Sequence, residues 1–72
     1  MNYEKWSLEY FEEAEKILRN MERLKEKLKK AKVDERQTIK QNIIRLRYLY
    51  YETLHTASYL KSRWEEMRTH AA

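Results

Sequence analysis

The fold is decided by residues 39–64, which read IKQNIIRLRYLYYETLHTASYLKSRW. Apolar or small residues recur in this stretch at alternating intervals of four and three. They are Ile39, Ile43, Leu46, Tyr50, Thr53, Ala57, Leu60 and Trp64, and the series continues to Met67 and Ala71. Such heptad spacing places them all on one side of an α-helix. We therefore predict a long helix over about residues 35–70.

A second heptad series lies earlier in the chain and predicts a helix over about residues 3–31. Its members are Tyr3, Ser7, Tyr10, Ala14, Ile17, Met21, Leu24, Leu28 and Ala31. Between the two series, the Asp34 carboxylate can accept hydrogen bonds from backbone N–H groups. The Gln37 side chain, three residues later, can reach back to the backbone N–H of Asp34. Asp34 is thus the predicted N-cap of the second helix. A connection of about two to five residues makes consecutive helices antiparallel neighbours.

The two series also fit a single antiparallel register. When positions whose numbers sum to 67 are paired, the first series from Tyr3 to Leu28 meets the second series from Trp64 to Ile39. The pairs include Leu28 with Ile39, Met21 with Leu46, and Ile17 with Tyr50. The sequence predicts an all-α antiparallel two-helix hairpin, with residues 1–72 as one domain.

Composition limits how such a hairpin is stabilised. The chain has 72 residues and contains no Cys, Gly or Pro. At this size a single-chain core is marginal unless disulfides, a metal or oligomerisation add to it. Without cysteine there are no disulfides and no thiolate metal sites, so oligomerisation is the expected source of further burial.

Apolar residues beyond the two series indicate where a partner binds. On the second helix, Ile44, Tyr48, Tyr51, His55 and Tyr59 step by four, three, four and four. A helix that is apolar on more than one side is usually buried on more than one side. We predict a symmetric homodimer that forms a four-helix bundle. The alternatives are another oligomer, a hetero-complex, and a monomer with exposed aromatic residues. The predicted interface comprises Trp6, Phe11, Leu18, Ile44, Tyr48, Leu49, Tyr51, Leu54 and Tyr59.

The net charge of +4 is unevenly distributed. Residues 1–15 hold five acids against one base, whereas residues 16–32 hold eight bases against two acids. A hairpin collects these bases at its loop end. There they can contact nucleic-acid phosphates or an acidic protein, or serve only helix-dipole stabilisation and solubility. The candidate contacts are Lys25, Lys29, Lys30, Lys32, Arg36 and Lys40.

Arginines and tyrosines alternate in residues 45–51, RLRYLYY. Nucleic-acid bases stack on exposed tyrosines while arginines hold the backbone, so this composition is compatible with RNA or single-stranded DNA. Tyr50, however, belongs to the predicted core, and Tyr48 and Tyr51 are residues that a dimer interface buries. Core and interface roles are the favoured interpretation.

One pair of residues matches a known metal-site spacing. Glu52 and His55 form Glu-x-x-His, which di-iron carboxylate bundles use twice, with further Glu residues such as Glu12 or Glu15 completing the site. The pair lies out of phase with the core positions Thr53 and Ala57, so both side chains point away from the seam. No metal or cofactor is expected. Nothing in the sequence matches a catalytic motif, and we expect no enzyme activity.

These patterns together predict a non-catalytic helical interaction or regulatory protein that acts as a homodimeric scaffold. Nucleic-acid binding through the basic loop end is the alternative, and a di-metal carboxylate bundle is the remote one. The longest run without a charge, Thr53 to Leu60, is far shorter than the ~20 apolar residues of a membrane span. No secretory signal or small-molecule substrate is evident, and the expected location is the cytoplasm.

Overall fold

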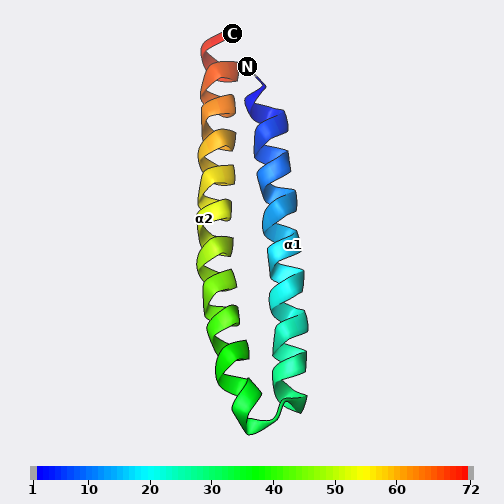
Figure 1. Cartoon of the computed structure of the whole chain (residues 1–72). Coiled ribbons are helices and arrows are strands. Elements are labelled where there is room, and N and C mark those ends of the chain that lie inside the picture. Colours follow the sequence, from blue (N-terminus) through cyan, green and yellow to red (C-terminus); the bar gives the residue numbers. More distant parts are fainter. Residues whose placement is uncertain (1, 72) are drawn as a thin grey trace.

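The computed structural model describes residues 2–71, apart from the side chains of His70 and Ala71. Two helices make up this part of the chain, α1 (Tyr3–Lys30) and α2 (Val33–Ala71). They lie side by side and antiparallel, with both termini at one end and the connection at the other (Figure 1). The molecule measures 59 × 15 × 14 Å. The predicted all-α antiparallel hairpin is confirmed.

Helix α1 is capped at its start and closes at its end without a left-handed residue. The Asn2 side-chain Oδ1 accepts a hydrogen bond from the Lys5 N–H at 3.0 Å, which is a standard N-cap contact. At the other end, Ala31 has extended backbone angles (φ −77°, ψ 149°), and its N–H donates to the Leu28 carbonyl at 3.3 Å. Residues 2–71 include no positive φ. A chain without glycine therefore makes this connection using ordinary backbone conformations.

The start of α2 corrects one prediction. The Lys32 carbonyl accepts the first helical hydrogen bonds, from the N–H groups of Glu35 at 3.0 Å and Arg36 at 3.1 Å. Lys32 is therefore at the N-cap position, and the prediction of Asp34 there was wrong. The connection needs only Ala31 and Lys32, so the helix begins two residues earlier than expected. Asp34 lies inside the first turn, where its charge still favours the positive end of the helix dipole.

The core consists of small and medium-sized side chains along the seam between the helices. All of its members come from the two predicted heptad series. Tyr10 and Met67 depart from the pattern, being 43% and 50% exposed. Met67 lies beyond the start of α1 in the sum-67 register, so no α1 residue covers it, and Ala71 has no described side chain. The buried residues are Ser7, Ala14, Ile17, Met21, Ile39, Ile43, Thr53, Ala57 and Leu60.

This core leaves much of the chain in contact with solvent. The accessible surface is 6117 Å². A compact monomer of the same mass exposes about 4,850 Å², so the hairpin exposes roughly 1,300 Å² more. No large side chain in the described part of the chain is completely buried. A two-helix layer has too little interior to enclose one.

Candidate interaction surface

The side of α2 that faces away from α1 is apolar and uncovered. Ile44, Tyr48 and Tyr51 are 63%, 68% and 62% exposed. Ile43 and Tyr50, each one residue before a member of this group, are buried and half-buried against α1. Because consecutive residues point about 100° apart around a helix, the exposed group is turned away from the seam with α1. Only Ile44, at its edge, lines a hollow together with α1 residues.

These residues belong to a longer heptad series that contains no charge. Its members are spaced alternately by four and three, and all of them are exposed. We call this set the outer stripe: Gln37, Gln41, Ile44, Tyr48, Tyr51, His55, Ser58 and Ser62. Hydrophobicity alone does not identify the two glutamines and the two serines as members of this series. Because 12 of the 39 residues in α2 are charged, eight heptad positions without a charge form a recognisable pattern.

The remaining predicted interface residues do not join this stripe in one patch. Phe11 and Leu54 are half-buried at one edge of the seam. Phe11 lines a hollow there together with Leu8, Lys61 and Trp64, and Leu54 precedes Lys61 by one heptad. Leu18, which is 39% exposed, follows Phe11 by one heptad and extends this face. Tyr59 is 58% exposed and lies beside the outer stripe rather than in it.

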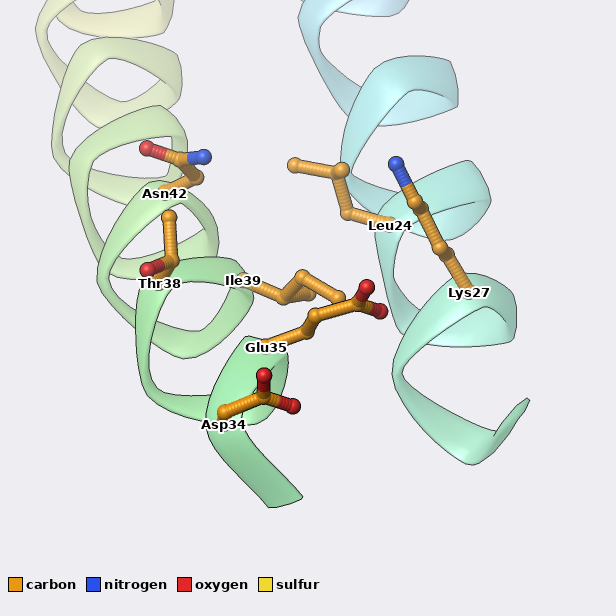
Figure 2. A pocket seen from close by; sticks show the side chains of 7 residues that line it. All are labelled: Leu24, Lys27, Asp34, Glu35, Thr38, Ile39 and Asn42. Atoms are coloured by element: carbon orange, nitrogen blue, oxygen red, sulfur yellow. The ribbon is translucent and has the colours of Figure 1, made fainter. Parts of the chain in front are cut away.

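Trp6 and Leu49 lie on the opposite face of the seam. They are 41% and 44% exposed. Lys27 and Asn42 line a hollow on this face near the loop end (Figure 2). Trp6 lies three heptads before Lys27 and Leu49 lies one heptad after Asn42, so both share the face of the hollow. The nine predicted interface residues are thus distributed over three sides of the hairpin. A single flat partner surface cannot contact all of them.

The hollow in Figure 2 has a volume of about 350 Å³. Ile39 and Leu24 extend toward each other across its floor, and Glu35 points from α2 toward α1. The other lining residues, Lys27, Asp34, Thr38 and Asn42, are exposed at its rim. This open shape differs from the enclosed pockets that cover most of a small ligand's surface.

The basic loop end carries all six residues predicted to contact nucleic acid, and each is exposed. Lys25 contacts Glu22 at 3.6 Å, and Lys29 contacts Glu26 at 3.1 Å. Lys25 and Lys40 also line one hollow with Arg47, beside Leu28 and Ile44. No ion pair is found for Lys30, Lys32, Arg36 or Lys40 within the described chain. The structure therefore gathers part of the predicted set into one basic edge.

The Glu52 and His55 side chains are exposed, on the side of α2 away from the seam. Glu12 and Glu15, which the metal hypothesis needs, are also exposed. Among the side chains that the structure describes, residues 2–69, no three His, Cys, Asp or Glu lie close enough together to hold a metal ion. Neither described helix is long and apolar enough to cross a membrane.

Fold and surface together define a class, the antiparallel helical hairpin with one uncovered helix face. No family model matches this chain, and no curated protein or solved structure matches it at a significant level. The exposed surface of the hairpin is therefore the basis for a functional proposal.

Proposed function

We propose that the protein is a non-catalytic interaction protein that works as a homodimeric helical scaffold of four helices. The observation that supports this most is the outer stripe, an uncharged and exposed heptad series on α2. Exposed apolar side chains scattered singly are normal on a monomer, but contiguous patches usually mark an interaction site.

The size of the exposed surface supports the same proposal. A typical specific interface buries about 800 Å² from each partner. The roughly 1,300 Å² by which this hairpin exceeds a compact monomer is large enough to supply that area. Symmetric pairs of identical chains are the commonest oligomers, and such a pair uses the same surface patch on both copies.

Equilibrium sedimentation tests the homodimer. We expect the mass of two chains at micromolar concentration, and Tyr51→Glu should shift the equilibrium toward the monomer because it places a charge in the interface. Leu8→Glu is the matched control, since Leu8 is 55% exposed on α1 and outside the predicted interface. A single-chain mass for the unmodified protein at all concentrations would refute the proposal, provided that circular dichroism shows intact helices.

Nucleic-acid binding is the second candidate, because Lys30, Lys32 and Arg36 surround the connection with no ion pair in the described chain. Affinity that comes from such contacts falls steeply with salt, by about one unit of log–log slope per phosphate neutralised. A fluorescence-anisotropy titration with random-sequence RNA across salt concentrations tests this. Replacing Lys29, Lys30 and Lys32 by Gln should flatten the slope, with Lys5→Gln as the control. Absence of binding at low salt would exclude this candidate.

A further inference from the structure

We infer that two copies pair through their outer stripes in parallel, so that the four helices form a flat row in the order α1, α2, α2, α1. This inference rests on the proposed homodimer and specifies its geometry. It makes the interface a two-stranded seam between the α2 helices. Both basic loop ends then lie at the same end of the dimer.

The position of the outer stripe leads to the row. Ile43 is 6% exposed against α1, whereas Ile44 and Tyr48 face away from it at 63% and 68%. A helix that packs on the outer stripe thus lies mainly on the far side of α2 from α1, and near the loop end it also adjoins the hollow that Ile44 lines with Lys25 and Leu28. From Gln37 to Ser62 the stripe extends about 38 Å at 1.5 Å per residue, which is long enough for several heptads of contact.

The residues that flank the stripe select the parallel orientation. One flank carries Lys40, Arg47, Leu54 and Lys61, each just before a stripe position. The other carries Thr38, Arg45, Glu52 and Tyr59, each just after one, and its heptad spacing continues to Glu66 beyond the last stripe position. In a parallel coiled coil these two flanks meet across the seam and their charges set partner orientation.

Parallel pairing brings opposite charges together. Each residue of the first flank then meets the residue five positions further along on the second flank of the other copy. Arg47 meets Glu52, Lys61 meets Glu66, and Leu54 meets Tyr59. Only Lys40 meets a like charge, on Arg45. Because the symmetry repeats each contact, the dimer gains four attractive charge pairs against two repulsive ones.

Antiparallel pairing removes this advantage, because it gives two attractive charge pairs against two repulsive ones. Each flank then faces its own kind on the other copy, in a register where stripe positions sum to about 99. Lys40 lies opposite Lys61, and Arg47 lies opposite Leu54. The only attractive contact is between Arg45 and Glu52. The repulsive contacts are equal in number in the two orientations, so the two additional attractive pairs favour the parallel one.

The charges that this seam needs are mostly unengaged. Among the ion pairs within residues 2–71, none involves Arg47, Glu52 or Lys61, while Glu66 contacts Arg63 at 3.7 Å. The lysine-rich ends of the two α1 helices lie three helix spacings apart, or about 24–30 Å at 8–10 Å each. That separation exceeds the Debye length of about 8 Å at physiological ionic strength, so their repulsion is screened.

Disulfide cross-linking tests the orientation directly, because the natural chain has no cysteine. A disulfide requires Cα atoms about 4.4–6.8 Å apart. In the parallel seam, Ser62→Cys meets its own copy and should cross-link to a covalent dimer under mild oxidation. In the antiparallel seam, residue 62 meets residue 37, so a mixture of Ser62→Cys and Gln37→Cys chains should form mixed dimers. Arg19→Cys, exposed on α1, is the control for random collisions.

A charge exchange gives a second readout that does not depend on cysteine. Arg47→Glu and Glu52→Arg should each weaken the dimer about tenfold in sedimentation, and the two changes together should restore it. In the antiparallel seam they restore nothing, because residue 52 then meets Arg45. A dimer that cross-links only between residues 37 and 62, or at neither site, overturns this inference alone. A monomeric unmodified chain overturns it together with the proposed homodimer.

Discussion

The two helices meet the same core and differ in everything outside it. Among the described side chains, helix α1 has four ion pairs between residues three or four apart, whereas α2 has one, between Arg63 and Glu66. The buried residues of α1 lie on one side, while α2 carries apolar residues on the seam and on the outer stripe. Eight of the fifteen charged residues of α1 thus take part in ion pairs within the described side chains, against two of the twelve in α2. The proposed dimer uses the second face of α2 and the charges that flank it.

The ion pairs of α1 do not explain why the hairpin holds together. Their side chains remain 46–73% exposed, and exposed pairs of this kind contribute only about 0.3–0.5 kcal/mol each. They stabilise α1 as a helix and keep it soluble. Association of the two helices depends instead on the thin row of buried side chains, each of which therefore matters.

The neighbouring residues Ile43 and Ile44 separate the two faces of α2 most sharply, and the largest effect is expected at the inner one. Ile43→Ala removes a side chain that is 6% exposed. Such a cavity lowers the free energy of unfolding by about 2–5 kcal/mol. Urea unfolding followed by circular dichroism should show this loss at every protein concentration. A loss below the level of surface substitutions would mean that the seam is not the core.

Ile44→Ala is the matched change one position further round. Its side chain is 63% exposed in the single hairpin, so its removal should leave the monomer's unfolding free energy nearly unchanged. It should weaken the dimer about tenfold, equivalent to about 1.4 kcal/mol, because a buried apolar contact is lost from each copy. Sedimentation measures the second quantity and dilute urea unfolding the first. Equal losses for Ile43→Ala and Ile44→Ala would remove the distinction between the faces.

Sequence alone predicted most of the fold and less of the surface. The heptad series placed Ile17, Ile43 and Ala57 in the core because helix periodicity and antiparallel pairing leave them no other position. The turn was less predictable. Asp34 carries a strong N-cap signal, yet the helix begins before it, at Val33, whose side chain is 88% exposed and gains nothing from packing. Local capping preferences are worth only about 1 kcal/mol, so they place a helix start to within one or two residues.

The interface prediction, which stays a prediction, includes residues from three sides of one molecule. Trp6, Phe11 and Tyr51 look alike in the sequence, since each is an aromatic residue outside the main series. Which side each occupies depends on the contact direction between the helices, and that is fixed only when the hairpin is assembled. The charge-free heptad through Gln41 and Ser58 was readable in the sequence, but hydrophobicity alone does not reveal it.

The helix starts extend the comparison to smaller effects. Asn2 caps α1 through the Oδ1 contact with the Lys5 N–H at 3.0 Å. Asn2→Ala should therefore lower the free energy of unfolding by about 1 kcal/mol. Asn2→Asp is the control, since it keeps an acceptor oxygen and should preserve stability. Urea unfolding measures the free energy of unfolding of both variants. An equal loss in the two would show that the acceptor oxygen of residue 2 does not stabilise the helix.

Helix α2 lacks such a side-chain cap, because Lys32 occupies the N-cap position and its side chain offers only donors. Lys32→Ser adds an acceptor and places Ser three residues before Glu35, which creates a capping box. We expect a gain of about 0.5 kcal/mol in the free energy of unfolding, the smallest effect of the four. Asp34→Ser is the informative control, since serine inside the first turn caps nothing. If Asp34→Ser stabilised the hairpin and Lys32→Ser did not, the helix would begin at the position that the sequence first suggested.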